Sequence, residues 1–244
     1  MPVPVDASIA VMVAISAAAG LVAGITGFGS GLVLMGVLVA IIPVQDAAVI
    51  AAITALVCSI LNLWTVRISM PWRETWPMFA ISIPAVAAGI YLLASLSPDV
   101  LRIMVAGMIL AGCGVTLWTP PQGLIGPGVG WSLAAGALGG LTGGATSTGG
   151  PPVVLYTLLR GWDKAVAKAV MSAFFVVMGF WRLALLIASG LATPETLRLG
   201  VVLLAPTLIA LYVGMWIFRR LSTQVFRYAA MALLGIMAAN LLIS

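Results

Sequence analysis

Two stretches decide the fold of this chain: Gly20-Leu-Val-Ala-Gly24-Ile-Thr26-Gly27 and, later, Gly136-Ala-Leu-Gly-Gly140-Leu-Thr142-Gly143. Each lies in an apolar segment, and each runs into a further glycine-rich break. Paired interruptions in the two halves of a membrane protein are typical of transporters whose substrate binds near the bilayer midplane. The motif therefore predicts a duplicated membrane protein with a binding site at its breaks.

Composition indicates an integral membrane protein. The sequence is 63% hydrophobic and 7% charged, with a mean hydropathy of +1.22. A chain of this composition cannot cover a water-facing surface, whereas lipid-facing helices require such an apolar composition. The net charge is +5, but the eleven basic residues are scattered at segment ends. That distribution is typical of membrane topology, so lipid is an expected partner and nucleic acid is not.

The apolar segments repeat in the same order in both halves. Two short segments come first, 7–24 with 30–43 and 129–143 with 151–160. Three longer ones follow in each half: 46–67, 76–96 and 99–118, then 164–189, 196–218 and 223–243. A Pro- and Gly-rich stretch between the halves cannot continue a helix. We therefore expect a first repeat (1–118), a linker (119–128) and a second repeat (129–244).

Helix length predicts how the repeats are oriented. Residues 7–43 would make about 55 Å of helix, too long for one crossing of a hydrocarbon core of about 30 Å. Each short pair therefore dips in and returns, or crosses twice. With three further crossings per half, the second half lies upside down relative to the first. The expected fold is an all-α polytopic membrane protein with two inverted repeats, each a broken or re-entrant helix pair followed by three long transmembrane helices. The Lys and Arg distribution fits a parallel repeat nearly as well.

The breaks combine flexible backbone with hydroxyl groups at the start of a new helix. Ser30 or Thr148 is expected to cap that helix, and Pro151 suits its first turn. Free N–H groups at helix starts attract anions. Alternatively, the glycines only allow close helix packing, which we expect for Gly20, Gly24, Gly136 and Gly140. The predicted substrate contacts are Thr26, Gly27, Phe28, Gly29, Ser30 and Gly31, with Thr146, Ser147, Thr148, Gly149, Gly150 and Pro151.

Two further polar residues belong to the candidate site, Asn62 and Arg182. A cation inside the membrane is a candidate ligand for an anion. Arg182 nevertheless follows Trp181 within two turns of the predicted helix end, which favours the membrane interface, and we expect Lys168 at the interface as well. Asn62 lies on a helix after the first break, where bonding between helices is the simpler interpretation.

The missing residue types limit the mechanism. The chain has no His, and its six acids fall at segment ends or in loops. No buried acid is therefore expected to relay protons, and an inside-negative potential alone favours anion export. No nucleophile–base pair, metal cluster or phosphate loop is present in the sequence. We expect a protein that is not an enzyme, with no cofactor and no metal.

The sequence resembles the TauE/SafE family, also called the sulfite exporter family. The resemblance rests on Gly24-x-Thr-Gly-Phe-Gly-x-Gly31, on Gly143-Gly-x-x-Ser-x-Gly-Gly-Pro151 with Tyr156 after it, and on Asp163-Lys164-Ala. It implies movement of sulfite, thiosulfate, sulfoacetate or related small organic anions across bacterial inner membranes, with the two breaks as substrate contacts. The first half has Ser30-Gly31-Leu32 where the second has Gly-Gly-Pro.

The expected function is a multi-pass secondary transporter or facilitator of the bacterial inner membrane. It would export a small sulfur-containing anion such as sulfite, thiosulfate or an organosulfonate. The alternatives are a transporter of a small carboxylate such as lactate, an anion channel, and a membrane scaffold that transports nothing. A homodimer is compatible with the sequence.

Overall fold

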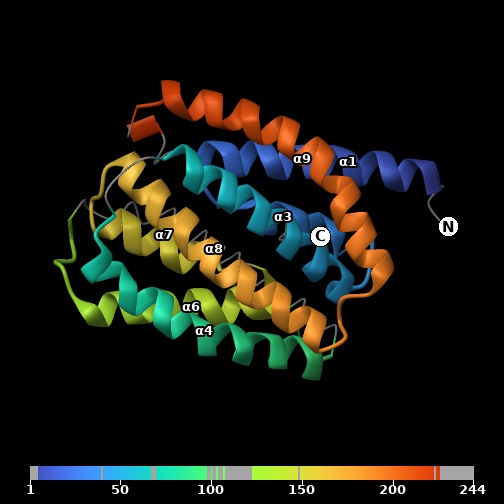
Figure 1. Cartoon of the computed structure of the whole chain (residues 1–244), viewed down its shortest axis with the longest axis horizontal. Helices are drawn as coiled ribbons and strands as arrows, with labels where there is room; N and C mark the ends of the chain where they lie inside the picture. The colour runs from blue at the N-terminus through green and yellow to red at the C-terminus, as the bar shows by residue number, and fades with distance from the viewer. Residues whose placement is uncertain are drawn as a thin grey trace.

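The computed structural model describes residues 5–39, 41–66, 70–97, 123–147 and 149–222, with residues 100, 103, 107, 224 and 225. Figure 1 shows the described helices lying along the long axis of the molecule. They are α1 (Val5–Thr26), α2 (Ser30–Leu38), α3 (Val44–Thr65), α4 (Trp72–Ser95), α6 (Val129–Thr146), α7 (Gly150–Leu159), α8 (Lys164–Ala188) and α9 (Pro194–Arg220). This part of the chain contains no strand, so the all-helical prediction is confirmed for it.

Four of these helices are long and apolar enough to cross a membrane: α3, α4, α8 and α9. They correspond to the first two long segments expected in each half. The third long segment of each half, 99–118 in the first and 223–243 in the second, lies almost entirely outside the described residues. Acidic residues start three of the four, with Asp46, Glu74 and Glu195 in the first turns of α3, α4 and α9. A negative charge there complements the helix dipole and stays at the end of the span.

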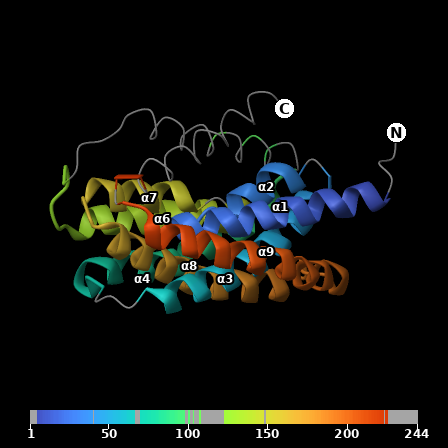
Figure 2. The same ribbon diagram turned by 90° about the horizontal axis from the view of Figure 1, so that it is seen from above.

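The other four described helices, α1, α2, α6 and α7, form two hairpins that enter from opposite ends of the molecule. In Figure 1, α1 begins at the end where α3 begins, and α6 begins at the other end, near the start of α8. Only Gly27 to Gly29 separate α1 from α2, and 147–149 separate α6 from α7. Figure 2 shows both hairpins in one layer, above a layer of α3, α8 and α4. The tips of the hairpins are thereby held inside the molecule.

Each hairpin packs against a long helix from the other half of the sequence. The first helix of one hairpin, α1, lies along α9, and α6 lies along α4. Glycines allow the backbones to touch: a Cβ on Gly24 would come 2.8 Å from Cα of Gly214, and a Cβ on Gly144 would come 3.0 Å from Cα of Gly89. Apolar helices in lipid associate through such close packing.

The glycines expected to serve packing do so. A Cβ on Gly20 would overlap the Thr207 backbone, and one on Gly140 would lie 2.9 Å from the Ser82 carbonyl oxygen. Gly136 is pressed in the same way against the backbone of Met78. The packing prediction for Gly20, Gly24, Gly136 and Gly140 is therefore confirmed.

Candidate functional site

The tips of the two hairpins meet. A Cβ on Gly31 would lie 2.7 Å from the carbonyl oxygen of Ser147, and a Cβ on Gly150 would lie 3.0 Å from the Phe28 ring. Between them is a small cavity lined by Phe28, Gly29, Ser30, Gly31, Leu32, Ala55, Ser59, Ser147, Gly150, Phe175, Met178 and Arg182. Its volume of about 30 Å³ accommodates roughly one or two water molecules. Breaks that are more than a hundred residues apart thus share one site.

Left-handed backbone makes the turns at both tips. Gly27 and Gly29 have φ of 83° and 92°, values that glycine adopts without steric cost. At the other tip Ser147 has φ of 60°, the only positive φ among the described non-glycine residues. Such a residue is strained by about 1–3 kcal/mol and tends to occur at functional sites.

Glycines, not hydroxyl side chains, precede the second helix of each hairpin. The N-cap of α2 is Gly29 and that of α7 is Gly149, and neither makes a side-chain capping bond. The expectation that Ser30 caps α2 is therefore wrong, because Ser30 is already the first helical residue. Thr148, the other expected cap, lies outside the described residues. Pro151 lies in the first turn of α7 as predicted.

Arg182 brings a positive charge to the cavity. Its side chain is buried, at 2% exposure, and Nη1 donates a hydrogen bond to Oγ of Ser147. Its Nε and Nη2 have no hydrogen-bond partner among the described residues. Leaving a buried charge without full compensation costs several kcal/mol, so this edge of the guanidinium is suited to hold an anion.

The outward, snorkelling orientation expected for Arg182 and Lys168 at the interface is wrong, because both side chains are buried. Lys168 is also buried, at 1% exposure, and its Nζ donates to the carbonyl oxygen of Gly24 at 2.6 Å. Trp181, next to Arg182, is exposed and donates to the carbonyl oxygen of Ile83. Neighbouring residues on a helix point about 100° apart, so nearness to a helix end did not decide which of the two faces lipid.

The predicted contacts divide into three groups. Seven line the cavity: Phe28, Gly29, Ser30, Gly31, Ser147, Gly150 and Arg182. Six are buried nearby without lining it: Thr26, Gly27, Asn62, Thr146, Gly149 and Pro151. Thr148 lies outside the described residues.

Residues beside the cavity shape its walls. Thr26 Oγ1 donates to the carbonyl oxygen of Phe28 at 2.7 Å and so fixes the first tip. Asn62 Nδ2 donates to the carbonyl oxygen of Ala23 at 2.9 Å, the bonding between helices that we expected for it. Gly149 packs against the backbone of Gly139, so it serves packing within the second hairpin.

A family match covers almost the whole chain. Residues 12–241 match the model of the sulfite exporter TauE/SafE family. The chain belongs to the TauE/SafE sulfite exporter family. Members of this family are membrane transporters and not enzymes. The match therefore confirms two expectations from the sequence, that the protein is a membrane transporter and that it is not an enzyme. Among curated proteins no significant match was found.

In this TauE/SafE protein, five cavity residues were not predicted as substrate contacts: Leu32, Ala55, Ser59, Phe175 and Met178. Phe175 and Met178 precede Arg182 by seven and four residues on α8, and such spacing places them on one helical face. The spacing was visible in the sequence. It became informative only once Arg182 was known to point inward.

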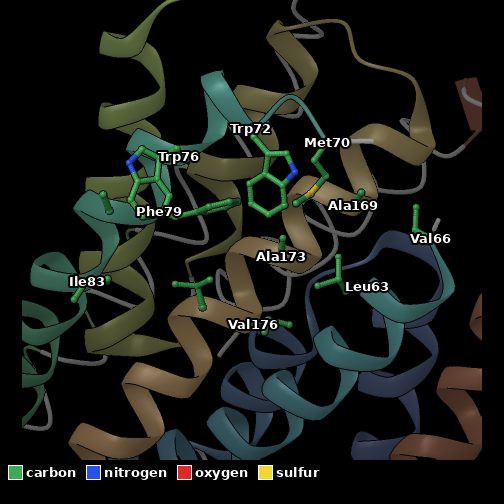
Figure 3. Close-up of a pocket in the computed structure, with 12 residues that line it drawn as sticks. Leu63, Val66, Met70, Trp72, Trp76, Phe79, Ile83, Ala169, Ala173 and Val176 are labelled. Carbon is green, nitrogen blue, oxygen red and sulfur yellow. The ribbon is translucent and has the colours of Figure 1, made fainter. Parts of the chain in front are cut away.

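A larger apolar groove lies between α3, α4 and α8 (Figure 3). It measures about 440 Å³ and is lined by side chains from α3, α4 and α8 and from the segment between α3 and α4. The Trp72 and Phe79 rings meet there edge to face, with centroids 6.1 Å apart. Among the described residues no charged side chain lines this groove, so none of them offers it a charge that would compensate an anion. In the TauE/SafE protein the small cavity, by contrast, is lined by the buried charge of Arg182.

Proposed function

We propose that this protein is a secondary transporter or facilitator that exports a small sulfur-containing anion, such as sulfite, thiosulfate or an organosulfonate, across the bacterial inner membrane. The anion binds in the cavity between the two hairpin tips. The observation that carries this proposal is Arg182, which is buried in the cavity wall with Nε and Nη2 unpartnered among the described residues.

The guanidinium suits an oxyanion. Its Nε and Nη2 form a planar edge that donates two parallel hydrogen bonds to two oxygens of one group. Serine hydroxyls line the same cavity at Ser30, Ser59 and Ser147. The backbone N–H groups at the start of α2 add the positive end of a helix dipole. An anion there compensates the buried charge and recovers part of its own desolvation cost.

We propose further that the two halves, 1–118 and 129–244 with the linker 119–128, are inverted repeats. In Figure 1, α1, α3 and α9 run one way along the long axis, and α6, α8 and α4 run the other way. The contacts follow the same symmetry, because the first helix of each half packs on a long helix of the other half: α1 lies along α9, and α6 lies along α4. Among the described helices, α1, α3 and α4 of the first half thus have antiparallel counterparts in α6, α8 and α9 of the second.

Packing favours one register for this repeat. The contact of Gly24 with Gly214 is matched by that of Gly144 with Gly89. Gly144 lies 120 positions after Gly24 (144 minus 24), whereas the sequence motif paired Gly24 with Gly140. In the same register Asn62 corresponds to Arg182, and each donates to the end of the first helix of its own half. The two registers differ by about one helical turn, which leaves each side chain on nearly the same face.

The distribution of basic residues supports a defined orientation of the protein in the membrane. Five described basic residues lie where α4 and α8 begin and α7 and α9 end: Arg73, Arg160, Lys164, Arg219 and Arg220. Cytoplasmic loops carry an excess of such residues. We therefore assign this end to the cytoplasm.

A cavity of about 30 Å³ also favours a carrier over a continuously open channel.

Flux in proteoliposomes tests the proposal. Arg182→Met removes the charge, and Arg182→Lys keeps the charge but loses the bidentate edge. We expect sulfite flux to be undetectable with Arg182→Met and at least about tenfold lower with Arg182→Lys. Arg198→Met, at an exposed position early in α9, is the matched control and should keep full flux. Normal flux with Arg182→Met in correctly folded protein would refute the site.

A further inference from the structure

Lys168 is a buried cation that the proposed binding mechanism does not use. Its Nζ donates to the carbonyl oxygen of Gly24 at 2.6 Å and lies 3.9 Å from the centre of the Phe218 ring. Among the described residues no carboxylate lies within ion-pair distance of it. Burial of an ammonium group is costly, so the contacts that it does make indicate a specific role.

The carbonyl group that Lys168 holds belongs to the last turn of α1. Helix-terminal carbonyls lack partners within the helix, and a cation there also complements the dipole. The aliphatic part of the lysine is equally close to the tip: a Cβ on Gly27 would come 2.7 Å from its Cγ. The next residue, Phe28, lines the cavity. Lys168 thus contacts the first hairpin immediately before it enters the site.

Lys168 and Arg182 belong to the same helix. They are 14 positions apart on α8 (182 minus 168), which corresponds to about 21 Å and nearly four turns, so both point to a similar side. Arg182 reaches the second tip through Ser147, and Lys168 reaches the end of α1 through Gly24. A single helix therefore sets where the first tip lies relative to the guanidinium.

We propose that Lys168 is the positioning residue of the candidate site. By holding the last turn of α1, it keeps Phe28, Gly29 and Ser30 in place against the Arg182 cavity. This role rests on the proposed function, but part of its test does not depend on transport. Without Lys168, the first tip opens more often, and only the closed fraction binds the anion.

The first arm of the test measures opening of the tip directly. Ser30→Cys, in a chain with Cys58 and Cys113 replaced by alanine, places a thiol at a position that is 3% exposed. We expect Lys168→Met to raise the rate of alkylation by N-ethylmaleimide about tenfold in monodisperse protein, since a charge-assisted hydrogen bond is lost. Lys168→Arg retains a cationic donor and should alkylate at a rate close to that of the parent.

Lys164 offers a matched control one turn away. Its Nζ donates to the carbonyl oxygens of Leu221 and Phe218 at the end of α9, and not to α1. Lys164→Met should therefore leave the alkylation rate of the thiol at position 30 unchanged. If Lys164→Met raised the rate as much as Lys168→Met, or if neither did, the positioning role would be refuted.

The second arm measures flux of radiolabelled sulfite into proteoliposomes. Loss of positioning lowers the binding-competent fraction, so Lys168→Met should raise the half-saturating sulfite concentration about tenfold, with rescue by Lys168→Arg. A purely structural defect would lower maximal flux and leave the half-saturating concentration unchanged, which would contradict the proposal. If the parent moved no sulfite, the proposed function would fail, and the alkylation arm would still decide the role of Lys168.

Discussion

At the scale of single residues, the site combines a buried charge with a strained serine. Ser147 adopts φ of 60°, and its hydroxyl oxygen accepts the hydrogen bond from Arg182. Glycine occupies the corresponding turn of the first hairpin, at Gly27 with φ of 83°. A serine at this position incurs a steric cost that glycine avoids. The hydroxyl group offsets that cost because it satisfies one donor of a buried guanidinium.

Substitutions at Ser147 separate the backbone effect from the hydroxyl effect. Ser147→Ala and Ser147→Gly both remove the acceptor of the Arg182 hydrogen bond, but only alanine keeps the steric cost of positive φ. We expect Ser147→Ala to be less stable than Ser147→Gly by about 1 kcal/mol. Thermal unfolding in detergent should then show a melting temperature lower by about 2–4 °C for alanine. Equal melting temperatures of the alanine and glycine variants would mean that the backbone at position 147 relaxes and alanine avoids the cost of positive φ.

At the scale of elements, the two hairpins are held by different means. The base of the second is tied to α4, where Arg160 donates from Nε and Nη2 to Oε2 of Glu74 at 2.9 and 2.7 Å. The first is held near its tip by Lys168. Both also rely on close backbone packing of α1 on α9 and of α6 on α4.

That packing predicts paired effects of alanine substitution. A Cβ on Gly214 would come 2.9 Å from Cα of Gly24, and one on Gly89 would come 2.9 Å from Cα of Gly144. We expect Gly214→Ala and Gly89→Ala each to destabilise the protein by about 1–3 kcal/mol, because two helices must separate. Thermal unfolding of purified protein in one detergent measures both.

Gly130 provides the control for these substitutions. It lies in α6, and a Cβ there would meet nothing within 4 Å. Gly130→Ala should therefore be neutral or stabilise the protein by about 0.5–1 kcal/mol, since alanine favours the helix. An equal loss of stability at Gly130 and at Gly214 would argue against specific packing.

At the scale of the whole molecule, the fully buried charges of the described residues are basic. Arg182 and Lys168 are buried, whereas Asp46, Glu74 and Glu195 lie in the first turns of their helices. No carboxylate is thus placed deep in the described spans, where it could carry a proton alongside the anion. An anion leaving the cell is driven by the membrane potential, at about 2.3 kcal/mol per charge per 100 mV.

The driving force follows from this distribution. We expect sulfite efflux from proteoliposomes to rise with an inside-negative potassium-diffusion potential and to need no imposed pH gradient. The measurement compares sulfite efflux with and without the potassium ionophore that generates the potential, at equal pH on both sides of the membrane. Efflux that ignored the potential and followed a pH gradient would mean that a proton travels with the substrate, either on the anion itself or on a protein group.

The sequence by itself determined the class of protein, most helices and the place of the breaks. These follow from local properties: apolar length predicts spans, and glycine and proline runs interrupt helices. The family resemblance, which the whole-chain match confirms, likewise rested on short motifs. Seven of the predicted contacts line one cavity because the breaks are also where helix ends stay free of regular backbone bonding.

Only the tertiary structure decided which side chains turn inward and which glycines of the two halves face one another. The burial of Arg182 and Lys168 depends on which face of α8 meets the hairpins, and nearness to a helix end carries no such information. In the proposed repeat, the register that the glycine contacts favour differs from that of the sequence motif by about one turn, a shift that periodicity cannot detect. Glycine rather than Ser30 precedes α2 because the turn needs a left-handed residue at that point.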